Sequence, residues 1–119
     1  MQGYRGLKTY QISYALAMEI FTVTKGFPRE ERYALVDQMR RSSRSIVANI
    51  AEGYRKKPYP RSYLSKLIDA DGELAETQVW IDFALDCGYL TADQHQTLGH
   101  RYAEVGRLLS GLLASVEIE

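Results

Sequence analysis

Cysteine, histidine and proline are scarce in this chain of 119 residues, which holds one cysteine, two histidines and three prolines. A single cysteine excludes an internal disulfide and a zinc site built from several thiolates of one chain. Because no histidine lies near Cys87 in the sequence, we expect a buried, inert thiol there. His95 and His100 are five residues apart and point to different sides of a helix, so we predict exposed histidines and no metal site.

Long apolar runs are also missing. The pairs Leu108-Leu109 and Leu112-Leu113 are separated by Ser110 and Gly111, whereas a membrane span needs about 20 apolar residues. We therefore expect no contact with a membrane. Residues 1–8 contain no apolar block followed by a small-residue cleavage site, so we expect no signal peptide and a cytoplasmic location.

The sequence also lacks the patterns of an enzyme. No nucleophile is paired with a base, and no glycine-rich loop could hold a nucleotide, so we predict neither catalysis nor a cofactor. Four carboxylates close together could form an acid/base or metal cluster: Asp69, Asp71, Glu73 and Glu76. We favour ion pairs instead. If Gly53 ends one helix and Pro60 starts the next at the same height along the bundle, Arg44 lies opposite about residue 69 and Arg40 opposite about residue 73.

What the chain does have is four long segments whose apolar residues recur at spacings of three and four. Helices often end at glycine and begin at proline, so Gly26 with Pro28 and Gly53 with Pro60 mark helix ends. Thr91 and Gln94 form a capping box. Short connections make neighbouring helices antiparallel. We predict a single all-α domain, residues 1–119, folded as an up-down-up-down four-helix bundle with helices at about 6–25, 29–52, 60–87 and 92–116.

Each predicted helix contributes one apolar stripe to a common core. The stripes consist of Ile12, Leu16, Ile20 and Val23; Leu35, Met39, Ile46 and Ile50; Leu64, Leu67, Leu74, Ile81 and Leu85; and Leu98, Tyr102, Val105, Leu109, Leu112 and Val116.

A net charge of zero hides a strong asymmetry along the chain. Residues 40–66 hold eight basic residues against the single acid Glu52, whereas residues 67–119 hold two basic residues against ten acids. The predicted nucleic-acid site consists of these eight: Arg55, Lys56, Lys57 and Arg61 in the connector, and Arg40, Arg41, Arg44 and Lys66 on the helices. Tyr54, Tyr59 and Tyr63 lie among them, and cations beside aromatic rings are typical of single-stranded or looped nucleic-acid sites. A solvated loop that complements the carbonyl end of helix two is the alternative.

A second set of residues favours self-association. Trp80 and Phe83 lie off the apolar stripe of helix three, and large aromatics outside a core indicate an interface. Helix four carries a stripe of small residues at a spacing of four and three: Gly99, Ala103, Gly106 and Ser110. Glycine within a helix costs about 1 kcal/mol relative to alanine, so close approach by another helix is expected. That helix belongs either to the same bundle or to a second subunit.

One stretch is specific enough to suggest a family. Residues 38–53, with the sequence QMRRSSRSIVANIAEG, follow Phe27-Pro28 and Tyr33 and precede Gly88-Tyr89. Together they resemble the four-helix-bundle proteins encoded by intervening sequences of bacterial 23S rRNA genes. In this motif we expect Ser42, Ser45 and Ala48 to let helices approach, and Glu52 to pair with Arg55 or with another subunit.

The resemblance implies a cytoplasmic homopentamer without established enzyme activity that binds RNA or DNA. A looser likeness to the accessory variability proteins of diversity-generating retroelements adds a reverse transcriptase as a possible partner. The function predicted from the sequence is therefore nucleic-acid binding by an oligomeric, non-enzymatic bundle. The alternative is a protein-interaction scaffold that makes no direct contact with nucleic acid.

Overall fold

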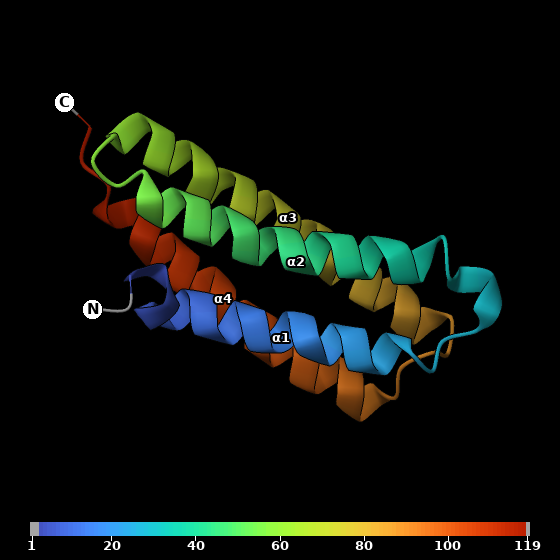
Figure 1. The fold of residues 1–119 in the computed structure, drawn as a ribbon. Coiled ribbons are helices and arrows are strands. Elements are labelled where there is room, and N and C mark those ends of the chain that lie inside the picture. The colour runs from blue at the N-terminus through green and yellow to red at the C-terminus, as the bar shows by residue number, and fades with distance from the viewer. Residues whose placement is uncertain (1–2, 119) are drawn as a thin grey trace.

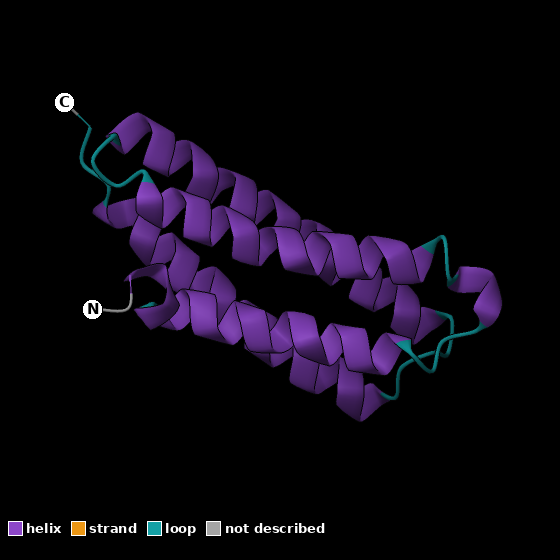
Figure 2. Ribbon diagram, viewed as in Figure 1, coloured by secondary structure: helices purple, strands orange, loops and turns teal. Residues whose placement is uncertain are grey.

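The computed structural model describes residues 3–118, which fold into four antiparallel α-helices (Figure 1). The helices are α1 (Lys8–Thr24), α2 (Leu35–Arg55), α3 (Pro60–Asp86) and α4 (Ala92–Ser115), and the short 3-10 helices η1 (Gly3–Gly6) and η2 (Arg29–Glu31) precede α1 and α2. Residues 3–118 contain no strand (Figure 2). The prediction of an all-α four-helix bundle is confirmed. None of the helices in this range has the length and apolar character of a membrane span.

Two helix starts follow from local sequence as predicted. Thr91 Oγ1 accepts a hydrogen bond from the Gln94 backbone N–H at 3.0 Å, and the Thr91 N–H donates to Gln94 Oε1 at 2.9 Å. This reciprocal pair is the expected capping box at the start of α4. α3 begins at Pro60. Proline suits this position because the N–H groups of the first helical turn have no partner within the helix, so its missing N–H costs no hydrogen bond.

Helix two differs from its predicted bounds at both ends. It begins at Leu35 and not near residue 29, because Arg29–Glu31 form a separate 3-10 turn. It also continues past Gly53 to Arg55, so the interpretation of Gly53 as a helix stop was wrong. Gly53 is buried, and a Cβ atom there would lie 3.3 Å from the Cβ of Lys66. The glycine therefore serves close packing of α2 on α3 and does not end α2.

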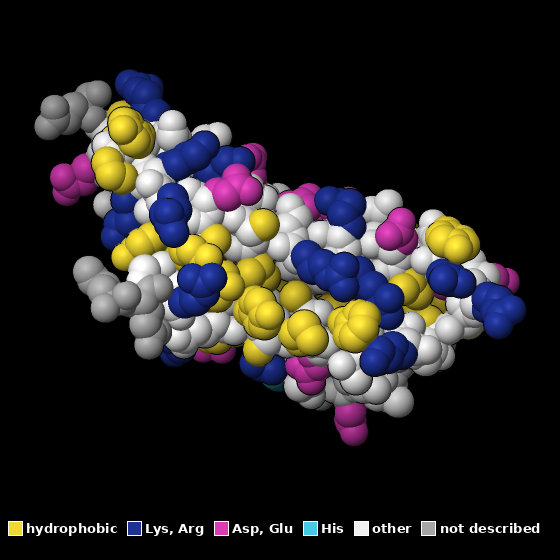
Figure 3. Space-filling model, viewed as in Figure 1, with side chains coloured by type: hydrophobic (Ala, Val, Ile, Leu, Met, Phe, Trp, Pro, Cys, Tyr) yellow, Lys and Arg dark blue, Asp and Glu magenta, His cyan; other side chains and the backbone are white. Residues whose placement is uncertain are grey.

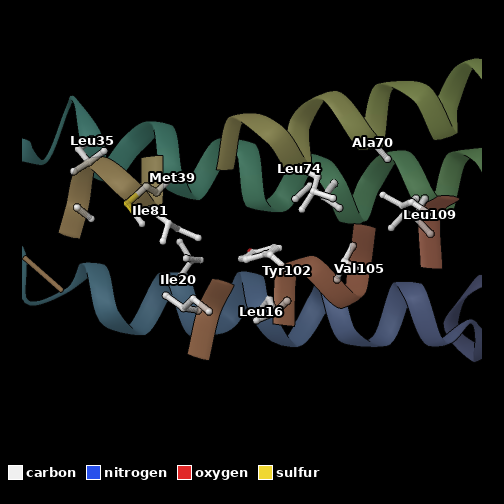
Figure 4. Packing of buried hydrophobic residues seen from close by; sticks show 14 of the residues in the cluster. Leu16, Ile20, Leu35, Met39, Ala70, Leu74, Ile81, Tyr102, Val105 and Leu109 are labelled. Carbon is white, nitrogen blue, oxygen red and sulfur yellow. The ribbon is translucent and has the colours of Figure 1, made fainter. Parts of the chain in front are cut away.

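The predicted stripes meet in one core along the bundle axis (Figure 4). Its fully buried side chains include Leu16 and Ile20 of α1, Met39, Ile46 and Ile50 of α2, Leu67 of α3, and Tyr102, Val105 and Leu109 of α4. Burial of these groups supplies most of the favourable free energy of folding. The Tyr102 hydroxyl is buried without a hydrogen-bond partner among the described residues, and burial raises its pKa.

The seam between α2 and α3 is lined by small polar residues. Ser42 and Thr77 are fully buried, and their hydroxyl oxygens lie 2.8 Å apart. The Thr77 hydroxyl also lies 2.9 Å from the carbonyl oxygen of Glu73, one turn earlier in α3. Ser42 thus permits close helix approach, as the sequence predicted. Ala48, in contrast, is exposed and faces away from this seam.

A hydrogen bond joins η2 to the α3–α4 connection. The Tyr89 hydroxyl donates to Glu31 Oε2 at 2.8 Å, while the Tyr89 ring packs 5.2 Å from the ring of Phe27. The hydrogen bond to Glu31 raises the pKa of Tyr89 from 10.0 to about 12.

Tyr89 should consequently ionise later than an ordinary tyrosine. Because its pKa is higher in the folded chain, the stabilisation from this hydrogen bond is complete below pH 10 and declines as the pH rises towards 12. In an absorbance titration of phenolate, Tyr89→Phe should remove the component that titrates near pH 12 and leave the late titration of the buried Tyr63 and Tyr102 unchanged. Loss of a component that titrates at the normal pKa would show that the hydrogen bond to Glu31 does not persist in solution.

Candidate nucleic-acid interface

The turn between α2 and α3 is short and internally hydrogen-bonded. The Lys56 N–H donates to the Gly53 carbonyl at 2.8 Å, and the Tyr59 N–H donates to the Lys56 carbonyl at 2.8 Å. Pro60 then starts α3 at once. The cations of this turn are therefore displayed on an ordered backbone, which reduces the entropy lost when a ligand binds them.

Four predicted cations project from this turn into solvent. Arg55, Lys56, Lys57 and Arg61 are all exposed, and none has an ion pair within residues 3–118. Tyr59, between them, is 68% exposed. The ammonium of Lys57 lies 5.0 Å from the ring centroid of Tyr54, close enough for a cation–π contact.

The N-terminal turn adds a fifth cation that the sequence analysis missed. η1 packs against α2, and the ring of Tyr4 has the Arg5 guanidinium 4.7 Å away and that of Arg55 5.8 Å away. Figure 1 shows η1 and the α2–α3 turn at the same end of the bundle. No local pattern predicts this meeting, because it depends on how the chain before α1 folds back. We call these five residues the basic end: Arg5, Arg55, Lys56, Lys57 and Arg61.

A hollow beside the basic end has a volume of about 490 Å³. It lies between the start of α3 and the segment that follows α4, and it is lined by Tyr59, Pro60, Arg61, Ser62, Glu117 and Ile118. The exposed ring of Tyr59 is a surface on which a nucleotide base can stack, and the guanidinium of Arg61 can contact a neighbouring phosphate. Glu117 is the one acid in this lining.

Two of the predicted cations are engaged in ion pairs between α2 and α3. Arg41 pairs with Glu73 at 2.8 Å and also with Glu76, and Lys66 pairs with Glu52 at 2.8 Å. The hydrogen bond from Lys66 lowers the pKa of Glu52. Ion pairs across this seam were predicted for Arg40 and Arg44, but Arg41 takes the place expected for Arg40. Glu52, which was expected to pair with Arg55 or with another subunit, pairs with Lys66 instead.

Arg40 and Arg44 turn towards α1 and not towards the acids of α3. Arg40 Nε donates to Thr24 Oγ1 at 2.9 Å and Nη2 donates to the carbonyl of Phe21 at 3.3 Å. Both guanidinium groups lie over the Phe21 ring, at 4.6 Å for Arg40 and 6.0 Å for Arg44. Arg40 thereby donates to one carbonyl group near the carboxyl end of α1, where a cation is favourable.

Tyr63 is not part of the surface. Its side chain is buried in the core, and burial raises its pKa. The signal was present in the sequence, because Tyr63 stands four residues before Leu67 and continues the apolar stripe of α3. Only Tyr54 and Tyr59 of the three predicted aromatics remain accessible near the cations.

The residues considered for catalysis or metal binding are dispersed. Within residues 3–118, no group of His, Cys, Asp and Glu side chains could hold a metal ion. His95 Nε2 lies 2.8 Å from Asp82 Oδ1 at the surface. The prediction that Cys87 is buried was wrong, since the residue caps the end of α3 and is exposed.

The residues predicted to form a subunit interface lie on the outer parts of α3 and α4. Phe83 is exposed, and its ring lies 5.8 Å from that of Trp80, which packs partly against the core. Ser110 is exposed, and Gly99 and Ala103 are partly exposed. A Cβ atom on Gly106 would meet Leu74 of α3 at 3.4 Å, whereas one on Gly99 would meet nothing within 4 Å. Packing within the bundle therefore accounts for Gly106 but not for Gly99.

Comparisons with known proteins agree with this architecture. A solved structure described as a protein of unknown function from the S23 ribosomal protein family of Bacteroides thetaiotaomicron has a TM-score of 0.81 to the chain, with 25% sequence identity. The alignment covers 90% of this chain and 96% of that one. No curated protein matches the sequence. The family model of the 23S rRNA-intervening sequence proteins matches residues 5–111, and the chain therefore belongs to that family.

Proposed function

We propose that the protein binds single-stranded or looped nucleic acid through the basic end. The observation that carries this proposal is the gathering of five exposed cations around accessible tyrosines, without an ion pair among the described residues. Cations that are already paired with carboxylates, such as Arg41 and Lys66, attract a phosphate only weakly. The basic end differs from them in this respect.

The shape of the basic end favours flexible strands over duplexes. The cations surround the end of the bundle, and no continuous helix face presents them to a groove of regular DNA. The exposed ring of Tyr59 can stack only on a nucleotide base that is not already stacked within a double helix. Phosphates would contact Arg55, Lys56 and Lys57, while a base stacks on Tyr59.

The test is a binding titration of the full chain with fluorescently labelled single-stranded RNA, single-stranded DNA and an RNA hairpin. We expect anisotropy to rise at about 50 mM salt, and the logarithm of the affinity to fall linearly with the logarithm of salt concentration. A perfectly paired duplex of the same length is the comparison and should bind more weakly. Absence of binding to every strand at low salt would exclude the proposal.

One observation favours the alternative of a protein-interaction scaffold. An apolar groove runs between α1 and α2, and it contains exposed tyrosine and methionine side chains. Such a surface suits a helix and not a phosphate backbone. The groove lies beside the basic end and does not include its cations, so the two functions are compatible.

A further inference from the structure

The hollow beside the basic end has the size and the lining of a site for one nucleotide base. Its volume of about 490 Å³ lies within the range of small-ligand sites, which runs from about 300 to 1,000 Å³. Figure 3 shows exposed hydrophobic side chains beside Lys and Arg at this end of the bundle. The ring of Tyr59, which is 68% exposed, and the side chain of Ile118, which is 40% exposed, both line the hollow. A flat base therefore has apolar surface to contact there.

The segment after α4 brings one carboxylate to this hollow, that of Glu117. Val116, the residue before it, packs partly against the core, and its N–H donates to the carbonyl of Leu113 at 3.3 Å. Glu117 follows directly on this anchored backbone and is exposed. Within residues 3–118 it has no ion pair, although Arg61 lines the same hollow. Its oxygens are therefore available to accept hydrogen bonds from a ligand.

The negative charge of Glu117 opposes binding of a phosphate, because like charges repel. Its favourable contacts with a nucleic acid must therefore be to a base. A carboxylate accepts hydrogen bonds and donates none, so it attracts the N–H groups of a base. The same carboxylate repels ring nitrogens and carbonyl oxygens, which are acceptors themselves. Glu117 therefore discriminates between bases by the donors that each of them presents.

Guanine is the base whose Watson–Crick edge fits a carboxylate. Its N1–H and its 2-amino group are adjacent donors that point in the same direction, so they can donate to both oxygens of one carboxylate. Cytosine and adenine each present an amino group beside a ring nitrogen that accepts, and uracil presents one N–H between two carbonyl oxygens. With these three bases, a hydrogen bond to one carboxylate oxygen brings an acceptor close to the other oxygen. Guanine is therefore favoured.

We infer that the hollow is a guanine site in which Glu117 binds the Watson–Crick edge of an unpaired base. The base stacks on Tyr59 and contacts Ile118, while Glu117 accepts hydrogen bonds from N1–H and the 2-amino group. Arg61 contacts a phosphate beside that nucleotide. This site depends on the proposed function and makes it more specific, because single strands and loops that contain guanine become the preferred ligands. A guanine within a duplex is excluded, since its partner cytosine occupies the same edge.

The test compares the affinity of the full chain for uridine heptamers that differ only in the central base. Fluorescently labelled strands carry guanine, adenine, cytosine or uracil at that position, so their charge and length are equal. In anisotropy titrations at low salt, the guanine strand should bind about tenfold more tightly than the other three, as expected of a bidentate contact to a base. A fifth strand carries hypoxanthine, which lacks only the 2-amino group of guanine. It should lose most of this advantage.

Three variants separate recognition of the base from contacts with phosphates. Glu117→Gln should remove most of the preference for guanine, while the affinity for the all-uridine strand stays equal or rises because a negative charge is lost. Tyr59→Ala should weaken binding of every strand, since stacking on an aromatic ring tolerates any base. Glu30→Gln is the matched control, because it removes the same charge from an exposed residue outside the hollow. It should keep the preference for guanine.

The outcomes distinguish failure of the guanine site from failure of the proposed function. Equal affinity of the wild type for all five strands would overturn the guanine site and leave nucleic-acid binding intact. A preference for guanine that survives in Glu117→Gln, or that is lost equally in Glu30→Gln, would also overturn it. If none of the strands binds, the guanine site and the proposed function are both wrong. Circular dichroism verifies the fold of each variant.

Discussion

Glutamine at Arg55, Lys56, Lys57 and Arg61 is expected to reduce the salt dependence of nucleic-acid binding sharply. Each phosphate neutralised on a single strand contributes about 0.7 to the slope of log affinity against log salt, so loss of four contacts should lower the slope by about 3. Affinity at low salt should fall as well. The measurement is anisotropy with labelled single-stranded RNA, repeated at several salt concentrations.

A second variant with the same change in net charge is the control. Lys25, Arg29, Arg32 and Arg107 are exposed and lie outside the basic end, so their replacement by glutamine removes an equal charge. Its salt slope should match that of the wild type, because none of these residues contacts a phosphate in the proposed complex. If both variants lose slope equally, binding depends on overall charge and not on the basic end.

Leucine at Ser42 is expected to destabilise the bundle strongly. Ser42 is fully buried in the α2–α3 seam, and its hydroxyl lies 2.8 Å from that of Thr77. A larger side chain must push α2 and α3 apart, which costs about 1–3 kcal/mol and should lower the Tm by about 5–15 °C. Thermal unfolding followed by circular dichroism gives both values.

Ser65→Leu is the matched control for this effect. Ser65 lies on α3 and is exposed, so the same substitution should change the free energy of unfolding by no more than about 0.5 kcal/mol. Equal melting of the two variants would mean that the seam has room for a larger side chain. The close approach of α2 and α3 would then not be a source of stability.

The fold was predictable from the sequence because its signals are local. Apolar residues at a spacing of three and four gave the helices and their buried faces, and Thr91 with Gln94 gave the start of α4. The end of α2 was predicted wrongly at Gly53 because glycine has two structural roles. It can end a helix, or it can admit a neighbouring helix, and only the position of Lys66 across the seam distinguishes them.

This one error also explains the wrong ion-pair partners. Since α2 runs on to Arg55, the hairpin turns later than expected, and each residue of α2 faces a later part of α3. Arg41 therefore reaches Glu73 and Glu76, while Arg40, about 100° away around the helix, is directed to the end of α1. The sequence predicts which kinds of residue meet, but the register depends on where the turn lies.

The candidate site was predictable in part for the same reason. The cations of the α2–α3 turn are adjacent in the sequence, whereas Arg5 and Tyr4 join them only through the folding of η1 on α2. The α1–α2 groove likewise needs two helices to exist. Its residues Tyr10, Tyr14 and Met18 do carry a signal, a second stripe at a spacing of four on α1, which could have been recognised.

Lysine footprinting tests the central claim most directly, because the chain's lysines sample different surfaces. Lys56 and Lys57 belong to the basic end, whereas Lys25 is exposed at the far end of α1, where it lies over the ring of Phe21. The protein is acetylated with and without saturating single-stranded RNA, and each lysine is quantified by mass spectrometry. The account predicts that RNA protects Lys56 and Lys57 and leaves Lys25 as reactive as before. Protection of Lys25 alone, or no protection of Lys56 and Lys57, would contradict it.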